Sequence, residues 1–499
     1  MVSDSANRVE RMRRGMGNIL AHSRIAVLRL SAPLALGLAV TACGSIGKVS
    51  DTLFGAGGPQ VGDQGYVSGF LGGAVADEPR AALAGREVLS SGGSAADAAV
   101  AMGFALPVTL PSRAGLGGGG ACIAYAASRK SINGGNPEAV LFVPIAPQSG
   151  IQGGRPAAVP MMTRGMFLLH ARYGTQPFEG LVAKAEQLAR FGVPVSRALL
   201  RDLSLVSGPL FADPGARAAF GRGGVPLTEG QLMVQPELSG TLSQIRLSGV
   251  GDLYQGAMAR RIQEMSAQVG GPITVADLRG ALPGLSAPLV VPYRDDKVAF
   301  LPPPADGGLA AAAAFSTLAR DPNDMGGAAA RALAAAARWR AGGTTGEEIL
   351  RSADLPQVGL PPLPASTTFG AMDRSGNAVM CAVTMGNLFG TGRMLPGLGF
   401  LLAASPATAP PPLLSVGLAW NEHLNSFRAA VAGSGQVGAP MAAAVGMLNA
   451  LRTNQPMAAP VPDPGRANAM SCPRYLPGDP ATCGLATDPR EAGLAAGGG

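Results

Sequence analysis

Histidine is scarce in this 499-residue chain, which has only His22, His170 and His423. No His or Cys spacing fits a metal site, so we expect neither a metal ion nor any other cofactor. Charged residues make up 14% and aromatic residues 5%, whereas apolar residues reach 47%, and there are 72 glycines and 42 prolines. This composition excludes a disordered chain and predicts a folded protein with a core of mostly small side chains.

Net positive charge is also small outside the N-terminal segment. Residues 1–43 hold six arginines against Asp4 and Glu10, and this difference of four is more than half of the net charge of +7. The rest of the chain is close to neutral. We therefore expect no nucleic-acid partner, because nucleic acids are bound by strongly basic surfaces.

The apolar run 30–42 is too short to span a membrane as a helix, which takes about 20 residues. It ends in the small residues VTA directly before Cys43, a pattern that resembles the cleavage box of bacterial lipoproteins. We predict a lipoprotein signal peptide over 1–43, lipidation of Cys43 and a flexible tether over 44–66. The lipid would anchor the protein on the periplasmic side of the bacterial cell envelope, and Gly44 favours the outer membrane. The alternatives are an ordinary signal peptide and an apolar N-terminal helix with a chance cysteine.

The four other cysteines are predicted to serve two purposes. Export exposes a protein to conditions that permit disulfides. Cys472 and Cys483 flank a Pro/Gly-rich loop, and we predict a bridge between them. Cys122 and Cys381 lie in apolar, strand-like segments, where we expect buried free thiols.

Apolar periodicity predicts alternating helices and strands along most of the chain. Helices are expected over 76–91, 95–106, 178–206 (as a pair), 256–269, 307–320, 326–341 and 438–452. Strands are expected over 139–143, 289–293, 297–301, 367–373, 378–384 and 428–432, and the tail 455–499 is expected to be irregular. Strands separated by helical pairs predict layers of helices around sheets.

The most informative segment is 366–379, STTFGAMDRSGNAV. Hydroxyl residues lead into an alternating strand, a turn follows at 375–377, and a second apolar strand begins. This arrangement resembles the N-terminal nucleophile hydrolases, which keep a catalytic hydroxyl at the head of a buried strand. Taken alone, without the segments around it, Ser366 indicates a plain polar residue that opens a strand.

Several segments resemble the γ-glutamyltransferase family, and they follow one another in the family's order. They are 92–101 (GGSAADAAVA), 115–120 (GLGGGG), 172–175 (RYGT), 189–196 (ARFGVPVS), 302–308 (PPPADGG) and 488–490 (DPR). The resemblance extends over about residues 66–497. It implies an α+β fold, a four-layer αββα sandwich of the N-terminal nucleophile hydrolase type.

The resemblance places the nucleophile at Ser366, seven residues before Asp373. It implies autocatalytic cleavage between Ala365 and Ser366, which would divide the domain into a large piece, 67–365, and a small piece, 366–499. A serine hydroxyl needs a base, and the α-amine freed by cleavage has a pKa near ~7.7–8.0, suited to that role. Thr384 matches a family threonine whose hydroxyl bonds the nucleophile.

The same resemblance implies an oxyanion site in the segment 433–438, GSGQVG. Backbone N–H groups of two glycines form it in the family, and these glycines align with Gln436 and Val437, next to Gly435. The N–H groups survive this change only if the turn keeps its shape, and a β-branched Val437 at positive φ would be strained.

The substrate pocket departs from the family in most of its polar residues. The arginine that binds the glutamyl carboxylate is replaced by Val143, and the asparagine after the second threonine by Gly386, with Asn387 one step on. The aspartate that holds the substrate amine falls near Thr408, and only Ser415 remains of a serine pair. Without the Arg and Asp, glutathione is a poor substrate, because its charged ends need opposite charges.

Two functions remain open. The first is a self-processed hydrolase or acyltransferase that acts on a γ-glutamyl or related acyl-amide bond of a small molecule or peptide, less charged than glutathione. The second is an uncleaved, inactive protein of the same fold that serves as an envelope binding or scaffold protein. Arg113, before the glycine run, is either a substitute cation for the substrate or a structural residue.

Overall fold

The computed structural model describes residues 70–356, 360–456 and 460–497. All of them belong to one compact unit, Pro59–Gly499. The predicted signal peptide, the tether and Cys43 lie outside the described residues. No helix in the described part is long and apolar enough to cross a membrane.

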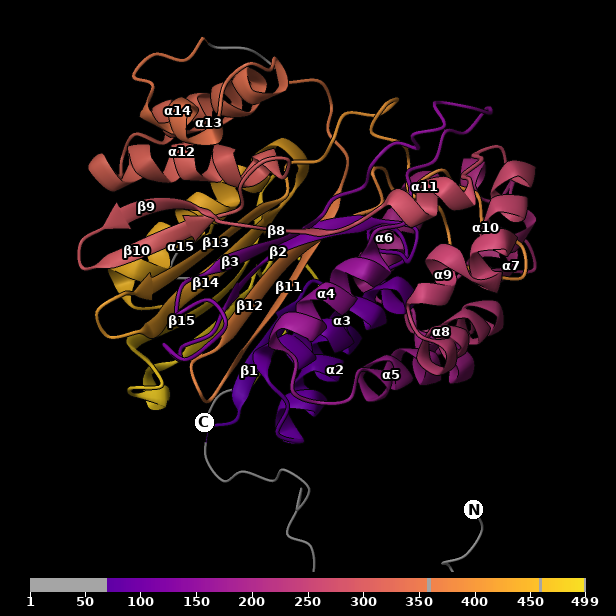
Figure 1. Ribbon diagram of the computed structural model, residues 1–499, viewed down its shortest axis with the longest axis horizontal. Coiled ribbons are helices and arrows are strands. Elements are labelled where there is room, and N and C mark those ends of the chain that lie inside the picture. Colours follow the sequence, from indigo (N-terminus) through magenta and orange to yellow (C-terminus); the bar gives the residue numbers. More distant parts are fainter. Residues whose placement is uncertain (1–69, 357–359, 457–459, 498–499) are drawn as a thin grey trace, which may run out of the picture. The chain divides into compact units, whose positions relative to one another are not determined.

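Two antiparallel sheets lie face to face at the centre of this unit (Figure 1). The first has seven strands in the order β17-β1-β11-β12-β2-β3-β8. They are β17 Leu494–Gly497, β1 Gly72–Ala76, β11 Ser366–Asp373, β12 Ala378–Thr384, β2 Gly119–Tyr125, β3 Glu138–Phe142 and β8 Gly284–Ser286. Strand β11, which begins at Ser366, and its neighbour β12 thus lie in the middle of a sheet whose other strands come from both ends of the chain.

The second sheet has six strands in the order β16-β15-β14-β13-β10-β9. They are β16 Gly484–Thr487, β15 Arg466–Leu476, β14 Ser426–Ser434, β13 Ser415–Asn421, β10 Asp296–Phe300 and β9 Leu289–Tyr293. Here the sequence prediction was wrong for the tail: residues 466–476 form a long strand because they pair with β14. Local composition, rich in small residues, does not reveal such a partner.

Helices cover the outer faces of both sheets (Figure 1). Against the first sheet lie α2 Pro79–Ser90, α3 Ala95–Thr109 and α4 Met162–Tyr173. Against the second lie α12 Asp306–Arg320 and α15 Ala439–Thr453, with α13 Met325–Arg340 and α14 Gly346–Arg351 outside α12. The prediction of a four-layer αββα sandwich is confirmed.

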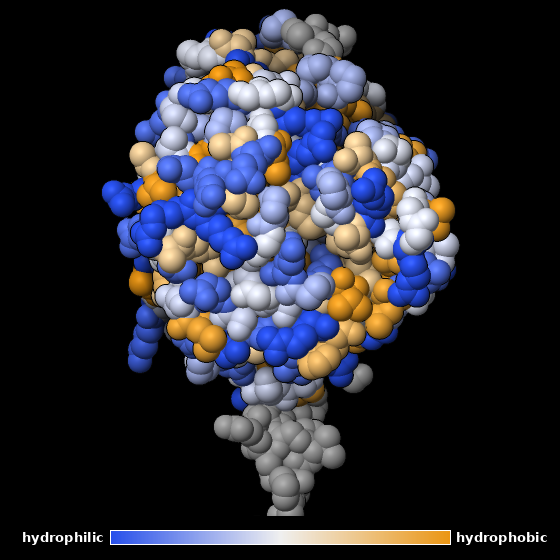
Figure 2. All heavy atoms as spheres, turned by 90° about the vertical axis from the view of Figure 1, so that its right-hand side faces the viewer, coloured by the Kyte–Doolittle hydropathy of each residue, from blue (hydrophilic) through white to orange (hydrophobic). Residues whose placement is uncertain are grey.

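A further group of helices extends from the first helix layer. It contains α5 Phe178–Phe191, α6 Arg197–Leu210, α7 Pro214–Phe220, α8 Pro236–Ser248, α9 Gly251–Gln255, α10 Ala257–Gln268 and α11 Val275–Gly280. Two small two-stranded sheets lie among them, β4 Val193–Pro194 with β7 Leu232–Met233 and the hairpin of β5 Gly221–Arg222 with β6 Val225–Pro226. On this side of the molecule, apolar side chains are scattered among polar ones (Figure 2).

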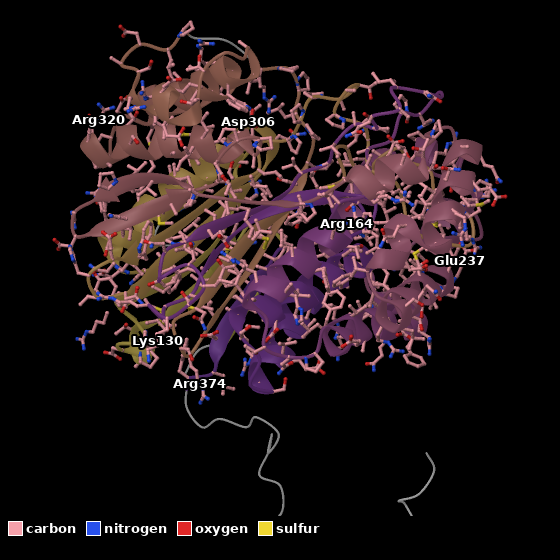
Figure 3. The ribbon with its side chains drawn as sticks, viewed as in Figure 1. Lys130, Arg164, Glu237, Asp306, Arg320 and Arg374 are labelled. Atoms are coloured by element: carbon pink, nitrogen blue, oxygen red, sulfur yellow. A yellow bond between two sulfur atoms is a disulfide. The ribbon has the colours of Figure 1, made fainter. Side chains whose placement is uncertain are left out.

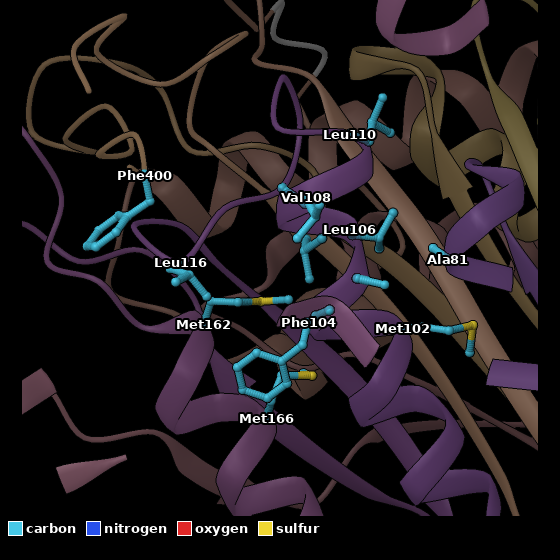
Figure 4. Close-up of a cluster of buried hydrophobic side chains, with 14 of the residues drawn as sticks. Ala81, Met102, Phe104, Leu106, Val108, Leu110, Leu116, Met162, Met166 and Phe400 are labelled. Atoms are coloured by element: carbon cyan, nitrogen blue, oxygen red, sulfur yellow. The ribbon is translucent and has the colours of Figure 1, made fainter. Parts of the chain in front are cut away.

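The core has one cluster under each helix layer and a third between the sheets. In β11, Phe369 and Ala371 join the cluster under α3, whereas Met372 joins the cluster between the sheets, as the two-residue period of a strand requires. The cluster under α3 includes Phe104 and Met166 (Figure 4). Helix α3 is buried along its whole length, and a capping box of Ser94 and Asp97 starts it. Asp97 is thus a first-turn residue of the helix.

Candidate active site

Ser366 is the first residue of β11 and is only 3% exposed. It shares a strand face with Met372, so its side chain lies on the side of the sheet that faces the second sheet. Directly opposite in β12 is Thr384, which pairs with Ser366 in the antiparallel register. The two hydroxyl residues therefore lie next to each other at the same end of the central strands.

The Thr384 hydroxyl both donates and accepts a hydrogen bond. The Oγ1 atom donates a hydrogen bond to the carbonyl oxygen of Ala365 at 2.7 Å, and it accepts one from the Gly386 N–H at 3.0 Å. The Ala365 carbonyl belongs to the peptide bond that precedes Ser366. A hydroxyl donor on this oxygen withdraws electron density from the carbonyl carbon, which makes that carbon easier to attack.

A buried polar cluster holds the start of β11 in place, and its centre, Asp77, was not foreseen from the sequence. Asp77 Oδ2 accepts hydrogen bonds from Thr367 Oγ1 and Thr368 N–H, both at 2.9 Å. Its Oδ1 accepts from Asn468 Nδ2 at 2.8 Å, and Asn468 also donates to Thr368 Oγ1 at 2.7 Å. These bonds fix the two residues after Ser366 and join β11 to the second sheet.

The segment that follows β14 turns sharply into α15. Gly435 is left-handed with φ 100°, Gln436 has φ 56°, and a 3₁₀ turn over Gln436–Gly438 leads into the helix. Gln436, rather than Val437, takes the positive φ, so the strain expected at Val437 is absent. Both side chains are exposed. Among the described residues, no hydrogen bond uses the N–H of Gln436 or Val437.

This turn is connected to the Ser366 end of β11 through Asn468. The backbone of Asn468 pairs with Ala432, three residues before Gly435, while its side chain bonds Thr368, two residues after Ser366. Two N–H donors at the start of a helix are suited to bind an anion. The turn thus keeps the donors that an oxyanion site needs, although its glycines are replaced.

A cavity of about 350 Å³ adjoins this end of the sheets. Its wall is mostly apolar and includes Val143, Ile145, Trp339, Leu414 and the proline-rich segment 409–412. Gly386, whose N–H bonds Thr384, also lines it. The cavity is therefore adjacent to Thr384, the residue that donates a hydrogen bond to the Ala365 carbonyl.

In the described part of the chain, Asp306 and Arg340 are the only charged side chains that line this cavity. Arg340 donates from Nε to Asp306 Oδ2 at 2.6 Å and from Nη2 to Oδ1 at 3.2 Å, and also from Nη2 to Pro411 O at 2.8 Å. The Asp306 side chain is 2% exposed. Burial raises the pKa of Asp306 although Arg340 opposes the shift. The guanidinium is thus already bound to a carboxylate of the protein itself.

The sequence profile of the Gamma-glutamyltranspeptidase family matches residues 81–339, more than half of the chain. The chain belongs to this family. It is 33% identical over 243 residues to the glutathione hydrolase proenzyme of Escherichia coli, covering 45% of this chain and 41% of that one. It is also 33% identical over 260 residues to the acylase ACY 1 proenzyme of Pseudomonas sp. strain SE83, covering 49% and 47%. The chain thus matches less than half of the length of these relatives.

The fold has solved counterparts. The crystal structure of cephalosporin acylase from Bacillus halodurans superposes with a TM-score of 0.70 and 20% identity, covering 86% of this chain and 96% of that one. This likeness shows a shared fold, while the sequence profile shows the Gamma-glutamyltranspeptidase family. Both leave the nucleophile and the substrate of this member to be inferred from its own residues.

The structure puts three residues of the predicted pocket elsewhere. Arg113 donates from Nε and Nη2 to both oxygens of Asp202, each at 2.8 Å, so its fork is occupied. Ser415 donates to the carbonyl of Leu413 at 3.0 Å and lies on the helix side of β13, because its neighbour Leu414 takes the side that faces the cavity. Asn387 is exposed, and its Oδ1 accepts from its neighbour's N–H. None of these three side chains lines the cavity.

Close contacts with the backbone of β12 explain why the family motif has a run of glycines. A Cβ on Gly118 would lie 2.5 Å from the Thr384 carbonyl oxygen, and one on Gly120 would lie 2.4 Å from that of Ala382. No side chain fits at such distances, so only glycines let β2 approach the end of β12. The run therefore supports the strand that carries Thr384.

The structure contains two disulfides, one of which corrects the sequence prediction. Cys472 and Cys483 are bridged. Cys122 and Cys381 are also bridged rather than free, because β2 and β12 are neighbours and their register sets these residues directly opposite each other, with Cα atoms 4.1 Å apart. In the described part of the chain, no group of three or more His, Cys, Asp or Glu residues has an arrangement that could hold a metal ion.

Proposed function

We propose that the protein is a self-processing amidase or acyltransferase with Ser366 as its N-terminal nucleophile. The observation that carries the proposal is the hydrogen bond from Thr384 Oγ1 to the Ala365 carbonyl, next to the Ser366 hydroxyl. The bond that this hydroxyl would cut is thus polarised by the residue opposite it. An inert strand has no need for such a donor.

In the first step, the Ser366 oxygen adds to the Ala365 carbonyl carbon. The C–N bond between the two residues breaks, a C–O ester forms, and the hydroxyl proton passes to the departing nitrogen. Water then hydrolyses the ester, which leaves a carboxyl group on Ala365 and a free α-amine and hydroxyl on Ser366. Thr384 stabilises the developing charge on the carbonyl oxygen. The proposed products are a large piece that ends at Ala365 and the small piece 366–499.

In the second step, the freed α-amine takes the proton from the Ser366 hydroxyl as that oxygen attacks an acyl amide. The α-amine passes this proton to the amine of the substrate, which leaves, and the acyl group stays on Ser366 as an ester. Water or a second amine releases it, which makes the enzyme a hydrolase or a transferase. The N–H groups of Gln436 and Val437 are proposed to stabilise the oxyanion, with Thr384 holding the nucleophile.

The cavity supports a neutral, apolar acyl group as the substrate. Val143 stands where the family has its carboxylate-binding arginine, and Trp339 and Leu414 extend the apolar wall. Arg340 is engaged by Asp306 and is not available for a substrate carboxylate. A γ-glutamyl group would bury its carboxylate without a partner, which costs several kcal/mol. An aliphatic or aromatic acyl chain has no such penalty.

The non-catalytic alternative is supported by one observation. The glycines of the oxyanion turn are replaced by Gln436 and Val437, whose side chains are exposed, so the turn differs from the one that the family uses. On this second proposal, the uncleaved chain serves as a binding or scaffold protein of the envelope.

We also propose lipid anchoring through Cys43, which the loss of labelled palmitate incorporation in Cys43→Ala would support.

Intact mass and N-terminal sequencing of the purified protein test the main proposal. We expect two fragments, the second starting at Ser366, and a single whole chain for Ser366→Ala. Ser375→Ala is the matched control, because it removes an exposed serine hydroxyl in the turn after β11 and should still be cut at the same bond. An uncut wild-type chain would overturn the hydrolase proposal in favour of the scaffold. Cleaved protein is then assayed with hexanoyl and γ-glutamyl p-nitroanilides, of which we expect only the first to be hydrolysed.

A further inference from the structure

A second cleft, of about 810 Å³, lies on the outer side of the second sheet. It is away from the apolar cavity lined by Val143, which we call the acyl cavity. It is bordered by the end of the β9 strand, the last turns of α12 and α15, and residues of α13 and α14. Asp306 of the acyl cavity and Arg320 of this cleft lie at opposite ends of α12 (Figure 3). The two sites are therefore separate.

Among the residues that the structure describes, five arginines and no acidic side chain line this cleft. They are Arg294, Arg320, Arg331, Arg351 and Arg452. Within the described residues, none of the five forms a salt bridge, whereas arginines elsewhere, such as Arg113 and Arg340, are paired with buried carboxylates. The cleft thus concentrates positive charge that the protein does not neutralise.

Arg331 shows this imbalance most clearly. Its Nη2 atom donates to the carbonyls of Ser352 at 2.6 Å and Leu350 at 3.2 Å, while its Nε is buried without any hydrogen-bond partner. Burial, followed by the charge of Arg320, lowers the pKa of Arg331. Burying a donor without a partner is unfavourable, so an anion in the cleft would relieve both the repulsion and the missing contact.

Helix dipoles explain part of this arrangement. Arg320, Arg351 and Arg452 lie in the last turns of α12, α14 and α15, where positive charge is favoured. That effect acts on each helix separately. It accounts neither for the convergence of the three ends on one cleft nor for Arg294 and Arg331, which are not at helix ends.

We propose that this cleft binds a ligand that carries two or more phosphate groups. Guanidinium groups bind phosphate oxygens through paired N–H donors, and five of them match several phosphates better than one carboxylate. The cleft also has apolar walls, from Val291, Leu350 and the ring of Tyr293, which suit an organic portion of the ligand. Such phosphates occur in soluble organophosphates and in lipid headgroups, and both sources present the same chemistry.

The full-length protein is titrated with inorganic tripolyphosphate by calorimetry at low and high salt, and is sedimented with phosphatidylcholine vesicles that contain or lack cardiolipin. We expect saturable binding of tripolyphosphate that weakens with salt. Cardiolipin-dependent sedimentation that tripolyphosphate reverses assigns the cleft to a lipid headgroup. Binding of tripolyphosphate without sedimentation assigns it to a soluble ligand. The absence of both overturns the proposal.

The triple variant Arg294→Gln, Arg320→Gln and Arg452→Gln removes three exposed members of the cleft. We expect its Kd to rise by about tenfold for each guanidinium lost, with self-cleavage unchanged. The matched control replaces three exposed arginines elsewhere, Arg222, Arg260 and Arg374, by Gln. Equal weakening in both triples would show that net charge, not the cleft, attracts the anion, and would refute the site.

Discussion

The disulfide between Cys122 and Cys381 is predicted to stabilise the protein more than the one between Cys472 and Cys483. The first closes a loop with a sequence separation of 259 residues and the second one of 11 residues. In the chain-entropy description, closure of these loops stabilises the folded state by about 5.6 and about 2.8 kcal/mol respectively. The two bridges should thus differ by about 3 kcal/mol for chain entropy alone.

The comparison is made in the uncleaved Ser366→Ala background, so that the chain is continuous. One variant carries Cys122→Ala with Cys381→Ala, and the other carries Cys472→Ala with Cys483→Ala. Equilibrium unfolding in guanidinium chloride gives the free energy of each. If removal of the long-range bridge lowers the free energy of unfolding no more than removal of the short-range one, the chain-entropy explanation is wrong.

The same bridge has a consequence for processing. Cys122 precedes Ala365 and Cys381 follows Ser366, so the bridge connects the two pieces that cleavage would create. Self-cleaved wild-type protein should run as one band on a non-reducing denaturing gel and as two bands after reduction. Two bands without reductant would mean that the bridge is absent from the processed protein.

Three further predictions address the site and its support. Thr384→Val should slow self-cleavage by about 10²-fold or more, because it removes the donor to the Ala365 carbonyl, while Thr384→Ser should retain most of the rate in a gel time course. Val143→Arg should lower hydrolysis of an apolar acyl anilide at least tenfold, since it places a charge in the apolar cavity; unchanged kcat/KM would remove Val143 from the pocket. Although burial alone would raise it, hydrogen bonds from Thr274 and Ser149 lower the pKa of Asp277 to about 2. Its contribution to stability is therefore fully present above pH ~4 and lost as the pH falls through about 2. In urea unfolding, Asp277→Asn should be less stable than wild type at pH 6 but about as stable as wild type at pH 2, and equal stability at pH 6 would contradict this role.

The sequence by itself determined the local elements and the family. The period of the apolar residues predicted most helices and strands, and Ser94 with Asp97 marked the start of α3. The turn at 375–377 and Asp373 set the position of Ser366 at the head of β11, opposite Thr384. These features depend on residues within a few positions of each other, and such patterns are readable without a fold.

Only the tertiary structure decided which distant residues meet. Asp77 bonds a hydroxyl 290 residues away, the bridge of Cys122 joins strands 259 residues apart, and β15 is a strand only because β14 is its partner. Ser415 and Arg113, which the sequence offered for the pocket, lie elsewhere because Ser415 faces the helix side of its strand and Arg113 is held by Asp202. The register of neighbouring strands and the face on which each side chain lies set all of these outcomes, and a shift of one residue would reverse them. That information is stored in the packing of the two sheets rather than in any single segment of the sequence.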